Sequence, residues 1–178
     1  MRRLFLLLMF MISTAALLQA QVSANDIVGI WFSHAGEAGS VSLVEVFEHE
    51  GKYYAYGMAY KEKSTGNEML DVKNPDPALR RRKMNEVVFL YDVVFNSAKE
   101  QWEGGEIYRP GDGKYFYVAW GRLSPDRKTL VWRVSVDRRG LMGANLEWTR
   151  VPDEAKYAAF KTPKDILIKN IPKERKKK

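Results

Sequence analysis

The sequence contains no cysteine and only two histidines. Without cysteine the chain forms no disulfide, has no thiol nucleophile and offers no thiolate to a metal ion. The histidines, His34 and His49, have no partner at the spacing of a metal site or of a Ser-His-Asp triad. We therefore expect no resident metal, no cofactor and no enzymatic activity.

Long apolar runs are also scarce: one spans residues 4–18, and no later stretch has the length of a membrane span. Two arginines precede this run and small residues follow it, which is the pattern of a cleavable secretion signal. Val22-Ser23-Ala24 is the better cleavage motif, and Leu18-Gln19-Ala20 is poorer because leucine is large for its position. We predict a signal peptide over residues 1–24, cleaved after Ala24, and a periplasmic or secreted protein. The alternative is an uncleaved N-terminal anchor.

Positive charge is concentrated at the C-terminus. The chain carries a net charge of +7, and residues 161–178 hold eight basic and two acidic side chains. We predict a single domain over residues 25–160, a monomer, followed by a basic, disordered tail over residues 161–178. The tail either solubilises the protein or docks on an anionic membrane surface or polymer. A nucleic-acid partner is not expected, because the remainder of the mature chain is close to neutral.

β-branched and aromatic residues recur in short runs that are separated by turn signals, as in Ser124-Pro125-Asp126-Arg127. Such spacing is typical of an antiparallel sandwich or barrel and not of a βαβ fold. We predict an all-β fold, an antiparallel up-and-down barrel of about eight strands, and a short C-terminal helix through about residue 160. The expected strands cover residues 27–32, 41–48, 52–60, 86–95, 104–108, 114–123, 128–136 and 144–151.

Four motifs carry a family resemblance. They are Gly29-Ile30-Trp31, Asn74-Pro75-Asp76-Pro77 with Leu79-Arg80, the run from Trp102 to Tyr108, and Trp148-Thr149-Arg150. In order and spacing they resemble the bacterial family named domain of unknown function 2147, over residues 27–151. The resemblance implies an exported protein with a lipocalin-like, calycin-type barrel. It implies no activity, and fold analogy does not assign one.

The aromatic residues of the expected strands are the strongest candidates for a binding site. An eight-stranded barrel either holds one small ligand or is filled by its own side chains, and both readings remain open. The aromatic candidates for lining such a site are Trp31, Tyr54, Tyr56, Trp102, Tyr108, Tyr117, Trp132 and Trp148.

A long polar connection over residues 61–85 supplies three further candidates, Asn74, Asp76 and Arg80. Long loops of this kind are often either functional or disordered. Its oxygen donors could bind a hard cation and its arginines an anion. The structural alternative is that Asp76 caps a short helix and pairs with Arg80.

The Glu103 and Glu106 pair is not expected to form a glycosidase site, because residues three apart in a strand face opposite sides. Gly104-Gly105 between them predicts a bulge or a close backbone approach. Two functions follow from these observations. The first is binding of a small apolar or amphipathic molecule. The second is an envelope interaction protein with a filled barrel and a docking tail.

Overall fold

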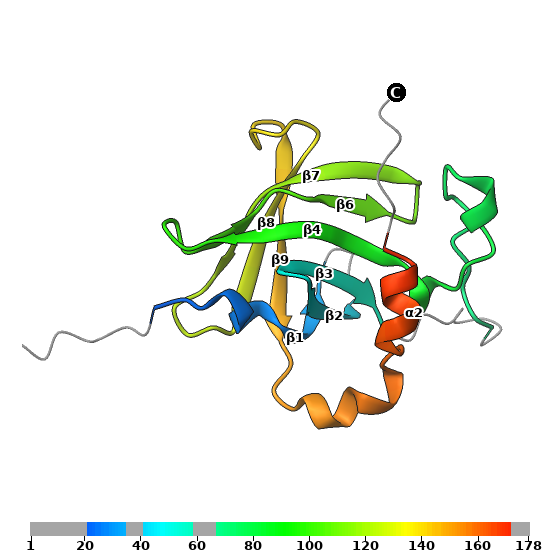
Figure 1. Cartoon of the computed structure of the whole chain (residues 1–178), viewed down its shortest axis with the longest axis horizontal. Helices are drawn as coiled ribbons and strands as arrows, with labels where there is room; N and C mark the ends of the chain where they lie inside the picture. The colour runs from blue at the N-terminus through cyan, green and yellow to red at the C-terminus, as the bar shows by residue number, and fades with distance from the viewer. Residues whose placement is uncertain (1–20, 35–40, 59–66, 172–178) are drawn as a thin grey trace, which may run out of the picture.

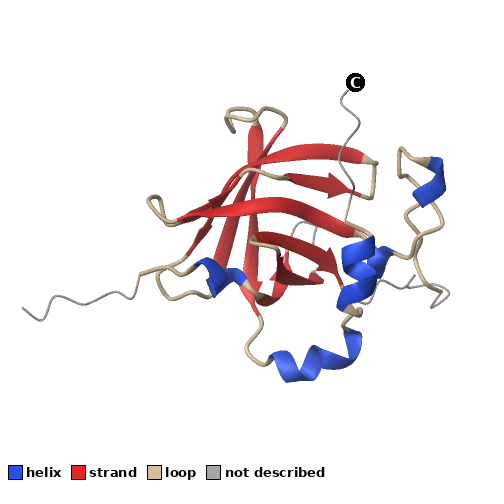
Figure 2. Ribbon diagram, in the orientation of Figure 1, coloured by secondary structure: helices blue, strands red, loops and turns tan. Residues whose placement is uncertain are grey.

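The computed structural model describes residues 21–34, 41–58 and 67–171. The described chain forms antiparallel strands, four short 3₁₀ helices (η) and one α-helix, which are shown in Figures 1 and 2. The strands are β1 Gly29–Ser33, β2 Ser42–His49, β3 Lys52–Gly57, β4 Val88–Asn96, β5 Gln101–Glu103, β6 Glu106–Arg109, β7 Lys114–Leu123, β8 Thr129–Ser135 and β9 Gly143–Arg150. The helices are η1 Ala24–Ile27, η2 Pro77–Leu79, η3 Met84–Glu86, η4 Glu154–Phe160 and α2 Lys164–Lys169.

The strands close into an eight-stranded barrel. From β1 to β5 and again from β6 to β9 each strand pairs with the next in sequence, and β9 returns to β1 with Arg150 opposite Trp31. The short strands β5 and β6 share one position in the barrel, because both pair with β4 on one side and β7 on the other. The predicted up-and-down barrel of about eight strands is therefore confirmed.

The predicted strand over residues 104–108 is wrong in its bounds, because Gly104 and Gly105 interrupt it. Both glycines have a φ of 72°, a left-handed conformation that side chains with a Cβ seldom adopt. A Cβ on Gly105 would lie 2.3 Å from the carbonyl oxygen of Tyr91. The close backbone approach predicted for this glycine pair is confirmed at Gly105, and the pair divides one strand position into β5 and β6.

Both faces of β3 are buried, which decides the outcome for two predicted site residues. Tyr53 and Ala55 face the barrel interior, where they join the main core. Tyr54 and Tyr56 face outward and pack in a second core that includes Leu167 of α2. Large side chains lie on both faces of this strand, because the C-terminal helices cover its outer face. Side-chain size alone therefore could not show which face lies inside the barrel.

The C-terminal region corrects the predicted tail. Asp153 caps η4 by accepting from the backbone N–H of Ala155. The chain then continues into α2, which lies beside β3 and β4 in Figure 1 and has Leu167 fully buried. Residues 161–171 are therefore part of the fold and not of a disordered tail. Residues 172–178 lie outside the described residues.

Candidate functional site

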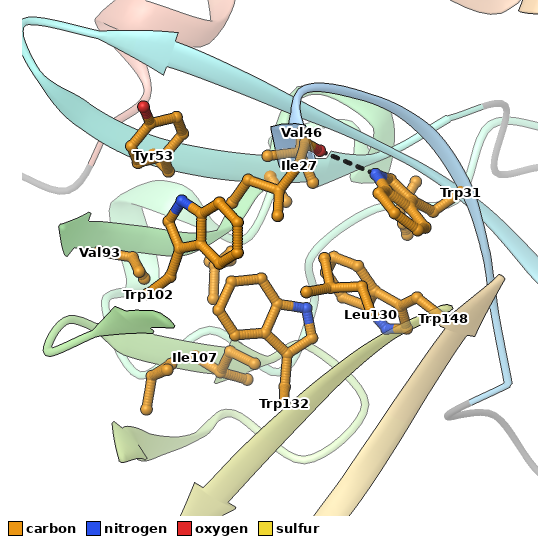
Figure 3. Close-up of a cluster of buried hydrophobic side chains, with 14 of the residues drawn as sticks. Ile27, Trp31, Val46, Tyr53, Val93, Trp102, Ile107, Leu130, Trp132 and Trp148 are labelled. Atoms are coloured by element: carbon orange, nitrogen blue, oxygen red, sulfur yellow. Dashed lines mark hydrogen bonds between the residues drawn. The ribbon is translucent and has the colours of Figure 1, made fainter. Parts of the chain in front are cut away.

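One half of the barrel interior is filled by aromatic side chains (Figure 3). Trp31, Trp102 and Trp132 are all fully buried there. The indole N–H of Trp31 donates to the carbonyl oxygen of Ile27 at 2.9 Å. Ile27 belongs to η1 and lies among these rings in Figure 3. None of these three tryptophans lines the cavity described below, so we assign them to packing rather than binding.

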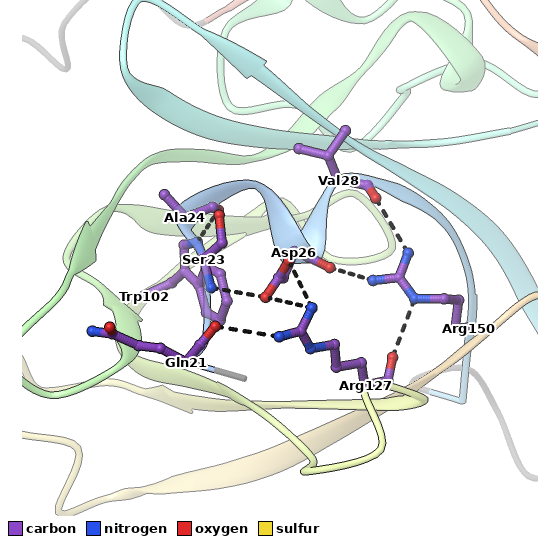
Figure 4. Close-up of polar contacts among 8 residues, drawn as sticks. All are labelled: Gln21, Ser23, Ala24, Asp26, Val28, Trp102, Arg127 and Arg150. Atoms are coloured by element: carbon purple, nitrogen blue, oxygen red, sulfur yellow. Dashed lines mark hydrogen bonds and ion pairs between the residues drawn. The ribbon is translucent and has the colours of Figure 1, made fainter. Parts of the chain in front are cut away.

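The N-terminal segment closes the barrel at the filled end (Figure 4). Trp102 donates its indole N–H to the carbonyl oxygen of Ala24 at 3.0 Å. The guanidinium of Arg127 contacts the Asp26 carboxylate at 3.3 Å and donates to the carbonyl oxygen of Gln21. Arg150 donates to the carbonyl oxygens of Asp26 and Val28. The predicted first mature residue after Ala24 therefore falls inside η1, and the described fold begins at Gln21.

The other half of the barrel is open and contains a cavity of about 590 Å³. This volume lies within the usual range for small-molecule sites, roughly 300–1,000 Å³. The inner wall is apolar and comes from six strands and the segment before β4. Its apolar lining includes Val44, Val87, Phe89, Ile107, Phe116, Val134, Leu146 and Trp148.

The cavity opens between the loops at the ends of β6 and β8, an end that we call the mouth. Met69, Met84 and Met142 border the cavity there. Methionine adapts its shape to different apolar partners, which suits a site that accepts a flexible ligand. Arg109 also borders the cavity; its guanidinium carbon lies 4.7 Å from the ring centre of Phe116, and the group donates to the Asp112 carboxylate. An apolar wall beneath this charged pair is an arrangement that suits an amphipathic molecule with a polar head.

A segment over residues 67–83, which we call the flap, packs beside the mouth through a buried ion pair. Arg82 donates to the Asp71 carboxylate at 3.0 Å, and their side chains are 9% and 0% exposed. Tyr108 and Asn74 also donate to Asp71, at 2.7 and 2.8 Å. Three donors thus neutralise and satisfy the carboxylate, so Asp71 holds the flap on the barrel.

The candidate residues Asn74, Asp76 and Arg80 shape the flap. Asp76 caps η2 by accepting from the backbone N–H of Ala78, as predicted. The predicted pair between Asp76 and Arg80 is wrong, because Arg80 donates instead to the carbonyl oxygen of Asn74 at 2.8 Å. The ion pair that sequence reasoning missed joins Arg82 to Asp71, eleven positions apart.

Only two of the aromatic candidates, Trp148 and Tyr108, reach the cavity. Trp148 lies in its wall, edge-on to Trp132 with ring centres 5.6 Å apart. Tyr54 and Tyr56 lie on the outer face, as described above. Tyr117 does not line the cavity, and its ring lies 5.1 Å from the Arg138 guanidinium carbon. The sequence analysis did not name Leu146 as a lining residue. Alternation along β9 could have identified it, because it places Leu146 on the same inward side as Trp148.

The outer-face tyrosines predict an alkaline transition. Burial, and secondarily Asp92, raises the pKa of Tyr54 to about 12 from 10.0. Burial and a hydrogen bond to Glu45 also raise the pKa of Tyr56. Since a raised pKa favours the protonated folded state, this stability is present below pH 10 and is lost as the pH rises towards 12. Tyrosinate absorbance should therefore rise together with loss of circular dichroism, whereas titration of all tyrosines near pH 10 in a folded protein would contradict this assignment.

The described residues hold no group of three His, Asp or Glu side chains that could bind a metal ion. In that same part of the chain, no helix is both long enough and apolar enough to cross a bilayer. The carboxylate oxygens of Asp71 are already engaged by protein donors, and one oxygen of Asp76 caps η2. The loop oxygens considered as cation ligands are thus used within the flap itself.

The model of a family described as uncharacterized protein conserved in bacteria (DUF2147) matches residues 29–150. The chain belongs to this family. Among solved structures, the DUF2147 chain is similar to protein HP1028 from Helicobacter pylori, described as belonging to the lipocalin family. The two are 31% identical with a TM-score of 0.69, and the match covers 82% of this chain and 98% of the other. No curated protein matches the sequence. The predicted resemblance and the lipocalin-like barrel are confirmed.

Proposed function

We propose that this DUF2147 protein is an exported, non-enzymatic carrier that binds one small apolar or amphipathic molecule in the open half of its barrel. The single observation that carries this proposal is the apolar cavity of about 590 Å³ at the mouth. The lipocalin-like fold agrees with a binding role. Export rests on the apolar leader and the small residues that follow it.

The geometry favours an elongated ligand with a polar head. Trp148 and Leu146 provide the apolar wall, and Arg109, paired with Asp112, provides polar groups at the mouth. A buried alkyl chain gains about 0.8 kcal/mol for each methylene removed from water. The alternative of a completely filled barrel has less support, because aromatic residues fill only the half next to η1.

Ala144 provides a direct test because it lies in the cavity wall on β9. Ala144→Trp should fill the cavity and weaken binding of cis-parinaric acid, a fluorescent polyene carboxylate, at least tenfold. The matched control is Asn145→Trp, since Asn145 is exposed, lies next along the same strand and is not part of the lining. Fluorescence titration measures both dissociation constants.

Two results would contradict the proposal: no binding of the probe to the unchanged protein, or equal binding by both tryptophan variants. Native mass spectrometry of protein purified from its own envelope provides an independent check. A co-purifying small molecule that is lost in Ala144→Trp and retained in Asn145→Trp would identify the ligand class.

A further inference from the structure

Exposed apolar side chains are concentrated around the mouth. Among the described residues, twelve large apolar side chains are exposed, and eight of them lie at this end of the barrel. Apolar patches of this kind on a water-soluble domain mark surfaces that contact a partner or a membrane. The eight are Val41, Met69, Leu70, Val72, Leu79, Val136, Leu141 and Met142.

The most exposed of them lie on the loop between β8 and β9, residues 136–142, which we call the tip. Leu141 is 73% exposed and Met142 is 67% exposed. In Figure 1 the tip projects from the top of the barrel as the yellow loop that joins the two strands. Met142 and Val136 also border the cavity, so the exposed apolar surface of the tip continues into the ligand site.

Many backbone groups of the tip are already engaged in internal hydrogen bonds. The Asp137 carboxylate accepts from the backbone N–H groups of Arg139, Leu141 and Met142. Arg133 donates to the carbonyl oxygens of Gly140 and Leu141. Unsatisfied peptide groups are the main cost of moving a loop out of water. Moving the tip out of water therefore leaves fewer peptide groups without a partner. The same hydrogen bonds lower the pKa of Asp137 and hold its negative charge within the loop.

Charge around the mouth is positive. The described segments around the mouth, residues 67–83, 109–114 and 136–142, together hold nine basic and five acidic residues. The segments at the filled end, residues 21–27, 48–52, 97–100 and 124–128, hold four basic and five acidic residues. Arg138 and Arg139 are exposed and directly precede the apolar part of the tip. Each cation close to an anionic bilayer contributes about 1 kcal/mol of attraction.

From this geometry we propose that the protein docks mouth-first on the surface of an anionic lipid bilayer, with Leu141 and Met142 inserted below the head groups. The proposal deepens the proposed function and rests on it, because docking would bring the cavity entrance to the apolar layer that holds an amphipathic ligand. Bilayer lipid matches both features of the mouth: its head groups complement the arginines and its acyl region accepts the apolar side chains.

Vesicle sedimentation tests this docking. The chain from Gln21 to Lys178 is mixed with vesicles of phosphatidylcholine and phosphatidylglycerol in equal parts, and with phosphatidylcholine alone. We expect binding to the anionic vesicles, weakening as salt increases. Leu141→Asn should reduce partitioning about tenfold through lost apolar burial. Arg138→Gln with Arg139→Gln should reduce it by a similar factor.

Two controls separate the tip from other surfaces. Val94→Asn removes an exposed apolar side chain on β4, away from the mouth, and should leave partitioning unchanged. Lys176→Gln with Lys177→Gln and Lys178→Gln removes charge from the C-terminus and should leave most of the binding intact. No binding to anionic vesicles, or binding that depends on these lysines and not on the tip, would overturn the proposal.

The docking proposal and the proposed ligand-binding function can be rejected independently of each other. Leu141 is not part of the cavity lining, so Leu141→Asn should bind cis-parinaric acid in the absence of vesicles as the unchanged protein does. Probe binding without tip-dependent vesicle binding rejects the docking alone. Tip-dependent vesicle binding by a protein that takes no probe supports the docking surface and rejects the ligand site.

Discussion

Replacement of Asp71 by alanine is expected to destabilise the protein by about 3–5 kcal/mol, because the buried Arg82 guanidinium loses its counter-ion. The two side chains are 0% and 9% exposed, and Tyr108 and Asn74 lose their acceptor at the same time. Urea unfolding followed by circular dichroism measures the difference. A cost of this size exceeds a third of the stability of many small domains.

The exposed pair between Lys83 and Glu68 is the matched control for the buried one. Its side chains are 45% and 52% exposed, and Glu68→Ala should cost less than about 1 kcal/mol. Asp71→Ala combined with Arg82→Met should recover part of the loss, since the isolated buried charge is gone. Equal costs for Asp71→Ala and Glu68→Ala would show that the flap is not held by the buried carboxylate.

Removal of residues 21–24 should destabilise the barrel by about 2–4 kcal/mol. The main cause is the Trp102 indole N–H, which loses the carbonyl oxygen of Ala24 and becomes a buried donor without a partner, at about 1–3 kcal/mol. Val22 and Ala24 also pack against the core, and their loss exposes apolar surface. Chains that begin at Gln21 and at Asn25 can be compared by thermal and urea unfolding.

Trp102→Phe provides the control, because it removes the donor itself. Truncation in that background should cost less than in the unchanged chain. Equal stability of the two chain lengths would contradict the role assigned to the segment. The result bears on processing, because cleavage at Leu18-Gln19-Ala20 would retain these contacts and cleavage after Ala24 would remove them. N-terminal sequencing of protein recovered from the envelope or the medium would test whether either predicted site is cleaved.

The barrel was predictable from sequence because its signals are local. Alternating side chains along β8 and turn residues such as Pro125 fix strands and reversals within a few positions. The capping role of Asp76 was predictable for the same reason. In contrast, the pairing of Asp71 with Arg82 depends on how the flap folds back, with Asp71 and Arg82 joined also through their backbones. From the sequence alone, an ion pair between residues closer together along the chain was expected.

The binding site was only partly predictable. Alternation showed that Tyr53 and Tyr54 face opposite sides of β3, but both sides are buried, so alternation could not identify the inside. Whether the barrel is filled or open depends on where each ring lies along the barrel. Trp102 and Trp148 look alike as sequence signals, yet one packs beneath η1 and the other borders the cavity.

The position of Trp148 gives the protein an intrinsic optical reporter. Of the five tryptophans, Trp31, Trp102 and Trp132 are enclosed in the filled half, whereas Trp148 borders the cavity. Its ring lies edge-on to Trp132, close enough for the two indole transitions to couple and produce a near-ultraviolet exciton signal. A molecule that enters the cavity changes the surroundings of only one member of this pair. Occupancy can therefore be followed in the unlabelled protein from the change in total tryptophan emission and in the shape of that signal.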